Sequence, residues 1–205
     1  MKTSNPPLPL GYSAIAPGRI ANFVTCLEMT EPPPRPTASL HVALDLQPLK
    51  HPDVDLYRDI FRRVGEDWLW CARLVMPDED LRAILKSPQV EGYILRRDRR
   101  PIGLLELDFR EAGQCEIAYF GLVKEAIGQG AGRYLMGRAI TIAWGRPIRR
   151  LWVHTCTFDH PSAVDFYRRS GFRPYAFAVE VMEDPRLSGL LPRHAAPHVP
   201  LIEPS

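Results

Sequence analysis

Hydrophobic positions recur along this chain with two periods, and each period predicts one kind of element. Alternation on every second residue, or a short β-prone apolar run, predicts strands. Apolar residues three and four positions apart predict helices. The predicted strands span residues 22–30, 39–46, 90–95, 102–109, 115–123, 148–155 and 175–181. The predicted helices span 53–64, 78–86 and 130–144, with a fourth that begins at Pro161 and is ended by Gly171.

The pattern also indicates how some of these elements connect. Residues 22–30 predict an extra edge strand, and a stiff Pro-Pro-Pro-Arg-Pro linker separates it from the first strand of the main sheet at 39–46. The strands 90–95 and 102–109 are expected to pair as a hairpin across a basic, solvated tip. Residues 183–205 are rich in proline and lack periodicity, so they are expected to drape over the domain or to contribute to a dimer contact.

Residues 121–134 join a predicted strand to a predicted helix through three glycines at alternate positions, Gly128, Gly130 and Gly132. A strand, a glycine turn and a helix present free backbone N–H groups and a positive helix terminus to an anion, which predicts a pyrophosphate site. The turn is no P-loop, because Arg133 follows Gly132 where lysine is needed. It also fails the dinucleotide pattern G-x-G-x-x-G, which requires glycine at position 133. A tight turn without a ligand is the alternative that this stretch alone leaves open.

A second motif lies downstream, where residues 163–172 read Ala-Val-Asp-Phe-Tyr-Arg-Arg-Ser-Gly-Phe. Together with the glycine turn, this segment resembles the GNAT superfamily of N-acetyltransferases. The acetyl-CoA motif of that family is Arg/Gln-x-x-Gly-x-Gly/Ala, and its later motif is Ala-x-x-Phe-Tyr-x-x-x-Gly-Phe. Residues 127–132 correspond to the first, and the second is matched at Ala163, Phe166, Tyr167, Gly171 and Phe172. One departure is Ile127, which stands at the usual Arg/Gln position and removes a side chain but no backbone amide.

The resemblance covers about residues 38–182 and implies a single α/β domain with a mixed, mostly antiparallel, splayed sheet flanked by helices. Residues 1–37 would then be a proline-rich N-terminal extension with an extra strand, and residues 183–205 a proline-rich C-terminal tail. The resemblance also implies acetyl-CoA as co-substrate and direct transfer of acetyl to a primary amine in a ternary complex. The rival interpretation, favoured by Ile127, is a catalytically silent acyl-CoA-binding sensor or partner module.

An amine attacks a thioester only as the free base, so the reaction needs a proton acceptor. In the family, this acceptor is often a glutamate on the strand that leads into the glycine turn. Glu116 holds that position here, and strict alternation places it on one face with Phe120 and Leu122. A solvent-facing glutamate at the strand end is the alternative interpretation. Glu106 and Asp108 on the preceding predicted strand are the fallback carboxylates.

Tyr167 matches the family tyrosine near the thioester sulfur and is the predicted general acid; a buried aromatic is the alternative. A backbone N–H near Leu122 and Val123 is expected to polarise the thioester carbonyl where the strand splays. Trp68 and Trp70 lie beside the helical pair that flanks the family's acceptor site, so they are expected to wall the acceptor pocket unless they are core aromatics. The residues expected to bind acetyl-CoA are Leu122, Val123, Ile127, Gly128, Gln129, Gly130, Ala131, Gly132 and Arg133.

Composition restricts the partners. The 26 basic and 24 acidic residues give a net charge of +2, which provides no reason to expect nucleic acid. No apolar run approaches the length of a membrane span and the N-terminus lacks the apolar core of a secretory signal, so we expect no membrane partner and a cytoplasmic protein. Cys26, Cys71, Cys115 and Cys156 form no C-x-x-C pair and are expected to be buried free thiols.

No metal is expected. His154, Cys156 and His160 follow the spacing H-x-C-x-x-x-H without a fourth ligand in view. His160 or Asp159 is expected instead to cap the helix that Pro161 begins. The tail histidines His194 and His198 receive no role, and the sequence does not identify the amine acceptor.

Overall fold

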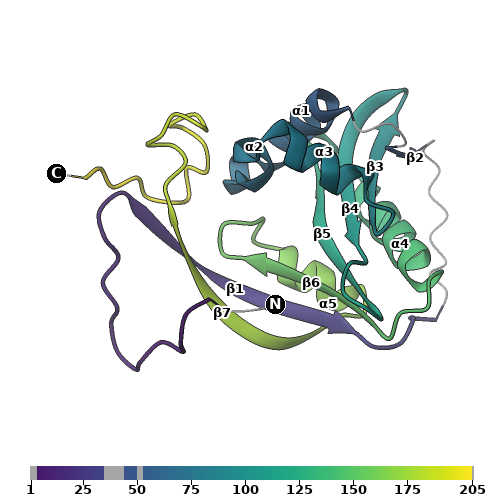
Figure 1. Cartoon of the computed structure of the whole chain (residues 1–205), viewed down its shortest axis with the longest axis horizontal. Coiled ribbons are helices and arrows are strands. Elements are labelled where there is room, and N and C mark those ends of the chain that lie inside the picture. The colour runs from purple at the N-terminus through teal and green to yellow at the C-terminus, as the bar shows by residue number, and fades with distance from the viewer. Residues whose placement is uncertain (1–3, 35–43, 50–52, 205) are drawn as a thin grey trace.

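One open sheet of seven strands organises the computed structural model, which describes residues 4–34, 44–49 and 53–204 (Figure 1). The strand order is β2-β3-β4-β5-β6-β1-β7, and every neighbouring pair is antiparallel except β5 with β6. The strands are β1 (Arg19–Met29), β2 (Leu44–Pro48), β3 (Val90–Arg97), β4 (Arg100–Asp108), β5 (Gln114–Leu122), β6 (Arg150–Cys156) and β7 (Arg173–Glu183). The α-helices are α1 (Val54–Gly65), α2 (Ala72–Val75), α3 (Asp78–Lys86), α4 (Ala131–Trp144) and α5 (Ala163–Arg169). This is the predicted fold class, a single domain with a mostly antiparallel sheet flanked by helices.

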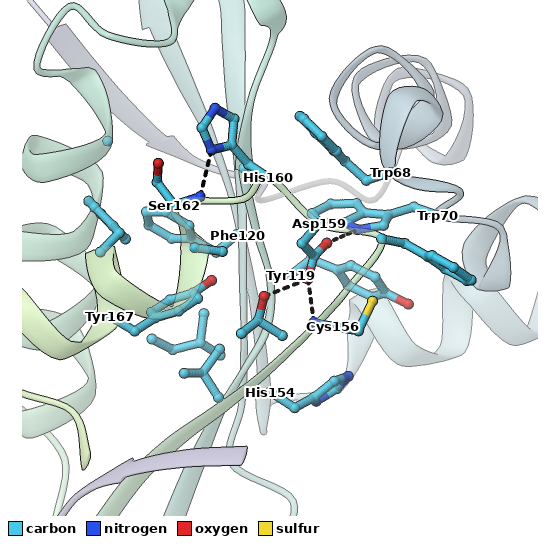
Figure 2. Close-up of a pocket in the computed structure, with 18 of the residues that line it drawn as sticks. Trp68, Trp70, Tyr119, Phe120, His154, Cys156, Asp159, His160, Ser162 and Tyr167 are labelled. Carbon is cyan, nitrogen blue, oxygen red and sulfur yellow. Dashed lines mark hydrogen bonds between the residues drawn. The ribbon is translucent and has the colours of Figure 1, made fainter. Parts of the chain in front are cut away.

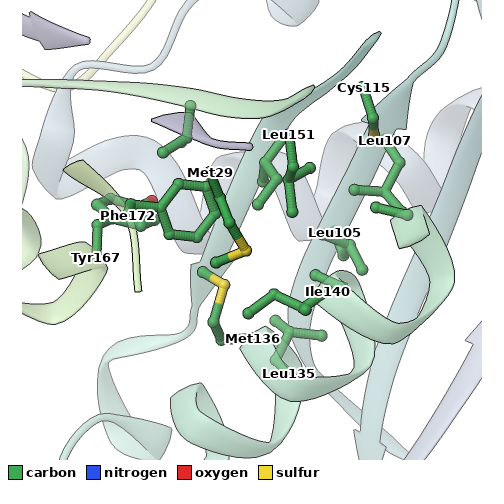
Figure 3. Close-up of a cluster of buried hydrophobic side chains, with 14 of the residues drawn as sticks. Met29, Leu105, Leu107, Cys115, Leu135, Met136, Ile140, Leu151, Tyr167 and Phe172 are labelled. Atoms are coloured by element: carbon green, nitrogen blue, oxygen red, sulfur yellow. The ribbon is translucent and has the colours of Figure 1, made fainter. Parts of the chain in front are cut away.

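Helices cover both faces of this sheet, because most of its strands carry apolar side chains on both sides. On one face, the apolar side of α4 and Tyr167 of α5 pack on Leu105 and Leu107 of β4 and Leu151 of β6 (Figure 3). On the other face, α1 and α3 pack on Ile94 and Leu104. Leu104 and Leu105 thus belong to opposite cores, as successive residues of a strand must.

Local sequence signals explain where the helices begin and end. Asp53 caps α1 through a bond from the Leu56 amide to its Oδ1, at 2.9 Å. Helix α3 has the predicted bounds, with three acidic residues in its first turn and Lys86 in its last. Helix α4 begins after Gly130, whose φ of 83° lies in the left-handed region that favours glycine. None of the helices in the described ranges has the length and apolar character to cross a bilayer.

The N-terminal strand lies inside the sheet, so its prediction as an edge strand is wrong. Strand β1 pairs with β6 on one side and with β7 on the other, in both cases antiparallel. It is buried on both faces, at Ile20 and Val24 on the cleft side and at Leu27 on the side packed by α4. Strand β7 is the edge instead. Alternation identified the strand, but its neighbours depend on a segment more than a hundred residues away, which no local pattern reports.

The hairpin strands and the strand predicted at residues 39–46 have different ends in the structure than in the prediction. Strands β3 and β4 extend into the predicted hairpin tip and leave only Asp98 and Arg99 in the turn, with φ of 49° and 65°. Two successive positive φ values are typical of a tight type I′ hairpin, which continues the twist of both strands. Of the predicted strand 39–46, residues 39–43 lie outside the described ranges, and β2 covers Leu44–Pro48.

A β-bulge interrupts β5 in its middle. Glu106 of β4 is paired with Tyr119 and Leu107 with Ile117, so Ala118 is an extra residue without a partner on β4. The bulge shifts the alternation by one position. Ile117 and Phe120 therefore both pack in the core beneath α4, whereas Tyr119 packs in the core beneath α1. Glu116 consequently does not share a face with Phe120 and Leu122, contrary to the prediction.

The parallel contact between β5 and β6 is short. It covers three residue pairs, from Gln114 with Arg150 to Glu116 with Trp152, and pairing stops there. Beyond this point the two strands diverge, which is the splay expected from the family resemblance. The separation leaves the β6-facing edge of residues 117–122 without a neighbouring strand.

The C-terminal tail packs on the body of the protein. Leu191, Ala196 and Val199 form a buried cluster with Leu69 and with Phe158, which lies just after β6. At its base, the buried Arg186 donates to both carboxylate oxygens of Asp184, at 2.9 and 2.7 Å. The same guanidinium also donates to main-chain carbonyls of the tail, those of Ala195, Ala196, Val199 and Pro200. Of the two expectations for the tail, the structure therefore shows the one in which it drapes over the domain.

Candidate active site

A cleft of about 750 Å³ occupies the gap between the diverging strands (Figure 2). One wall is β5 from Ile117 to Leu122, and the opposite wall is β6 from Val153 to Cys156. The glycine turn and α5 line one end. The other end is lined by segments far apart in the sequence, including Trp68, Trp70, Asn22 and Glu180. The bulge and the splay thus open a channel through the middle of the sheet.

The glycine turn presents unpaired amides to this channel. Gly128 and Gly130 have φ of 81° and 83°, conformations in which side chains other than glycine are strained. Within the described residues, the N–H groups of residues 128–133 donate to no acceptor. A Cβ on Gly128 would meet nothing within 4 Å, so the turn faces open space. Free amides at the N-terminus of the fourteen-residue α4 form a site that suits an anion.

Side chains around the turn supply positive charge despite the departure at Ile127. Ile127 lines the cleft and is partly exposed. Gln129 is held by Arg97 of β3, whose Nη1 lies 2.5 Å from its Oε1, and donates to the Glu125 carbonyl at 2.6 Å. Arg133, on the first turn of α4, is exposed and lines the cleft. Thus Arg97 and Arg133 both lie close to the turn without any contribution from position 127.

The two strand-edge residues expected to polarise the thioester are not equivalent. The Val123 amide already donates to the Ile102 carbonyl at 2.9 Å. In an antiparallel ladder, hydrogen-bonded and non-hydrogen-bonded pairs alternate, so Leu122, opposite Gly103, directs its N–H away from β4. Its amide therefore faces the side where β6 has diverged, which makes Leu122 the available donor.

Tyr167 lies at the middle of the cleft, with its ring in the core and its hydroxyl toward the channel (Figure 2). The ring packs against Phe120, Phe166 and Phe172 at centroid distances of 6.2, 5.7 and 5.9 Å. Its hydroxyl makes no hydrogen bond to the described part of the chain. Burial raises the pKa of this phenol well above its ordinary value, and the charge of Asp159 adds to the effect. Tyr167 therefore stays protonated at neutral pH and can donate a hydrogen bond.

Glu116 lies outside the residues that line the cleft, in a separate shallow recess with Asp108, Arg110 and Trp152. Its Oε1 is 3.3 Å from Nδ1 of His154, and His154 does line the cleft. His154 therefore contacts both this carboxylate and the channel. In the sequence, His154 is recognisable only as a possible metal ligand, because its contact with Glu116 depends on the pairing of β5 with β6.

Glu106 and Asp108, the alternative candidates for the catalytic carboxylate, form hydrogen bonds with neighbouring side chains instead. Glu106 is fully buried; its Oε2 accepts from the Tyr57 hydroxyl and its Oε1 from Arg73 Nη2, both at 2.5 Å. Asp108 accepts from Arg110, and these bonds outweigh burial to lower the pKa of its carboxyl. Neither carboxylate faces the cleft.

Both tryptophans line the cleft, and a single aspartate fixes one of them (Figure 2). Asp159 Oδ1 accepts from Trp70 Nε1 at 3.2 Å, and its Oδ2 accepts from the Thr155 hydroxyl at 2.7 Å and the Cys156 amide at 2.9 Å. The expectation that Asp159 caps α5 is therefore wrong. His160 accepts from the amide of Ser162, the residue before that helix, at 3.1 Å.

Trp70 packs where only glycine fits at positions 65 and 121, and Trp68 contacts the C-terminal tail. A Cβ on Gly65 would lie 2.4 Å from Trp70 Cβ, and a Cβ on Gly121 would lie 3.2 Å from the Trp70 ring. Trp68 packs between His160 and His198, at 5.6 and 6.0 Å between ring centroids. His198 is also 3.0 Å from the Phe158 carbonyl. A tail residue to which the sequence assigned no role thus helps to place the wall of the cleft.

The cysteines and histidines form no metal centre in the part of the chain that the structure describes. All four cysteines are free; Cys26 and Cys115 are buried as expected, while Cys71 and Cys156 are partly exposed and line the cleft. Burial, more than any charge, raises the pKa of the Cys156 thiol to about 12, so it is neutral at pH 7.

Solved structures with this fold come from several sources. A GCN5-related N-acetyltransferase from Kribbella flavida is 18% identical with a TM-score of 0.56, over 84% of this chain and 63% of its own. An aminoglycoside acetyltransferase from an uncultured soil metagenomic sample, solved with sisomicin, is 18% identical with a TM-score of 0.52, over 62% of this chain and 87% of its own. At such identities the likeness shows the fold alone. The chain spans less than two thirds of the length of the Kribbella protein. No curated protein matches the chain.

The family follows from the sequence model that matches the chain. The model of the Acetyltransferase (GNAT) family matches residues 55–172, more than half of the 205 residues. The match runs from α1 to Phe172 and so includes the glycine turn, both walls of the cleft and Tyr167. The chain therefore belongs to the GNAT family of acetyltransferases, whose members use acetyl-CoA as co-substrate.

Proposed function

We propose that this protein is an N-acetyltransferase that moves acetyl from acetyl-CoA directly to a primary amine in a ternary complex. The observation that carries the proposal is the continuity of the cleft. Unpaired amides lie at one end, aromatic rings and carboxylates lie at the other, and Tyr167 lies between them. A channel that reaches both ends lets the thioester and the amine meet without a covalent enzyme intermediate.

In this proposal, the glycine turn binds the pyrophosphate through the amides of Gln129, Gly130, Ala131, Gly132 and Arg133. The pantetheine arm would lie along the free edge of β5, where the gap to β6 admits an extended chain. The Leu122 amide would then donate to the thioester oxygen as negative charge develops there.

The amine must lose a proton to react, since an ammonium ion with a pKa near ~10 is about one part in a thousand free base at neutral pH. We propose that His154 accepts this proton and that Glu116, 3.3 Å away, stabilises the resulting imidazolium. The nitrogen attacks the carbonyl carbon, the C–S bond breaks, the thiolate of CoA leaves, and the new amide nitrogen releases its second proton to solvent. Glu116 keeps the catalytic importance that the sequence predicts, but it acts through a neighbour.

Tyr167 would donate a hydrogen bond to the departing sulfur. Because burial raises the pKa of the phenol above that of an ordinary thiol near ~8.5, complete proton transfer from Tyr167 is uphill. Stabilisation of the thiolate by a hydrogen bond is therefore the larger expected effect, and solvent can protonate the sulfur afterwards.

The direct test combines binding and turnover. Calorimetry should show one acetyl-CoA site per chain, and a panel of amines should release free CoA thiol together with the N-acetylated product by mass spectrometry. Acetyl-CoA binding without release from any amine would favour the rival, a silent acyl-CoA-binding module. The same preparations, measured by light scattering, would test the predicted homodimer.

A further inference from the structure

Asn22 carries a polar atom that no neighbour satisfies. This residue of β1 is 3% exposed and lines the cleft. Its Nδ2 donates to Glu180 Oε2 at 2.9 Å, and its Oδ1 has no partner within the described residues. The amide orientation is fixed, because a carboxylate only accepts hydrogen bonds and so must face the NH₂ group. A buried carbonyl oxygen without a donor is costly, so this oxygen indicates a missing donor.

Glu180 places a negative charge beside that oxygen. It is paired with Asn22 across β1 and β7, and it also lines the cleft. Its charge contributes, after burial, to the raised pKa values of the Cys71 and Cys156 thiols. Cys71 belongs to the segment that carries both tryptophans, so Glu180 faces the acceptor end of the cleft.

The other charges that line the cleft are distributed unevenly. Arg133 lies beside the glycine turn, and α5, which carries Arg169, packs on that turn through Phe166 near Gly132. The acceptor end has Asp159 and Glu180, but the oxygens of Asp159 already accept three hydrogen bonds. Asn22 Oδ1 and Glu180 Oε1 thus accept no hydrogen bond within the described residues. Both residues line a cleft with aromatic walls, which attract cations. A group with several N–H donors and a positive charge satisfies both.

We infer that the acceptor substrate carries a second, protonated nitrogen besides the amine that is acetylated, and that Asn22 and Glu180 bind this ammonium group. The inference rests on the proposed function and specifies its substrate class as diamines, polyamines or sugars with several amino groups. Acceptors with a single nitrogen lack the group that fills this subsite.

A binding experiment tests the subsite without turnover. The protein is saturated with CoA and titrated calorimetrically with linear α,ω-diamines, from diaminopropane to diaminooctane, each beside the monoamine of equal length. At least one diamine should bind about tenfold or more tightly than its monoamine, as for a hydrogen bond to a charged group. Glu180→Gln and Asn22→Leu should reduce this preference to about twofold or less and leave monoamine affinity unchanged. Glu183→Gln on the same strand, whose carboxylate pairs with Arg19, should keep the full preference.

Several outcomes would overturn the inference. Diamines that bind no more tightly than monoamines to the wild type would remove the subsite, as would a preference that survives Glu180→Gln. If Asn22→Leu fails to fold, Glu180→Gln decides alone, because Glu180 lies on the exposed edge strand. Acetylation of monoamines and diamines at equal rates with equal affinity would leave the proposed function standing without the subsite. A diamine preference in a protein that acetylates no amine would leave the subsite standing without the function.

Discussion

At the scale of single residues, the His154–Glu116 pair carries the acid–base proposal. His154→Gln should lower turnover about 10²- to 10⁴-fold, the range typical of one general base. The loss should be largest at low pH, where free amine is scarcest, and should partly recover as the pH rises. Glu116→Gln should give a smaller loss with the same pH trend, because it removes only the charge that stabilises the imidazolium. Rate profiles from pH 6 to 10 with a saturating amine measure both.

The comparison between the two variants shows whether Glu116 accepts the proton itself or acts through His154. If Glu116 accepted the proton itself, Glu116→Gln would lose more activity than His154→Gln. Profiles that run parallel to the wild type for both variants would exclude the pair as the base. Acetyl-CoA affinity serves as the control and should stay unchanged, since neither residue lies at the glycine turn.

Tyr167 should show a different signature. Tyr167→Phe keeps the ring that packs against Phe120 and Phe172 and removes only the hydroxyl. Turnover should fall about 10²-fold or more without recovery at high pH, because the change affects departure of the thiolate and not supply of the free amine. An acyl donor with a more acidic thiol should restore part of the rate. Full activity in Tyr167→Phe would reduce this residue to a core aromatic.

At the scale of elements, the glycine turn depends on backbone conformation. Gly130→Val places a branched Cβ at a φ of 83° in the turn that presents the amides, and acetyl-CoA binding should be lost. The substitution also strains the backbone by about 1–3 kcal/mol. Gly189→Val is the matched control, because Gly189 has a φ of 74° and open space around it in the tail. Both variants should melt at similarly lowered temperatures, and calorimetry should show that only Gly130→Val fails to bind. Unchanged affinity in folded Gly130→Val would remove the turn from the cofactor site.

At the scale of the whole molecule, one buried arginine ties the tail to the domain. Arg186→Met leaves Asp184 and several tail carbonyls without their donor, and removing one partner of a buried pair costs about 3–5 kcal/mol. Urea unfolding should show this loss. Arg193→Met breaks an exposed tail pair with Glu203 and should cost at most about 1 kcal/mol. Equal effects of the two substitutions would contradict the buried role of Arg186.

Tyr119, which is partly buried in the core beneath α1, should lower the stability of the fold at alkaline pH. Burial raises the pKa of Tyr119 to about 12, whereas the phenol of the unfolded chain ionises near ~10. Above pH ~10 the unfolded state therefore binds fewer protons, so stability is complete below that pH and is lost as the pH rises toward 12. The slope should be about 1.4 kcal/mol per pH unit for each such tyrosine. Tyr119→Phe should flatten the dependence measured by urea unfolding between pH 8 and 11. A slope equal to that of the wild type would show that Tyr119 does not contribute.

The sequence by itself determined most elements and the glycine turn at one end of the cleft. Periodicity located α1, α3 and α4 almost to the residue, because amphipathic helices and their caps are local signals. The glycine turn could be predicted equally well, because glycine adopts the positive φ found at Gly128 and Gly130 without strain. Tyr167 and the two tryptophans were instead predicted from the family resemblance, and all three line the cleft.

Only the tertiary structure decided what depends on partners distant in sequence. The bulge at Ala118 arises between β4 and β5 and separates Glu116 from the face of Phe120, and the parallel pairing of Glu116 with Trp152 brings its carboxylate beside His154. Strict alternation along one strand cannot show either effect. The place of β1 beside β7 brings Asn22 to Glu180 across 158 positions. The end of the cleft that Asn22, Glu180 and the two tryptophans line is therefore a product of long-range strand pairing and tail packing. The glycine turn is built from one continuous segment, and for that physical reason the sequence alone revealed it.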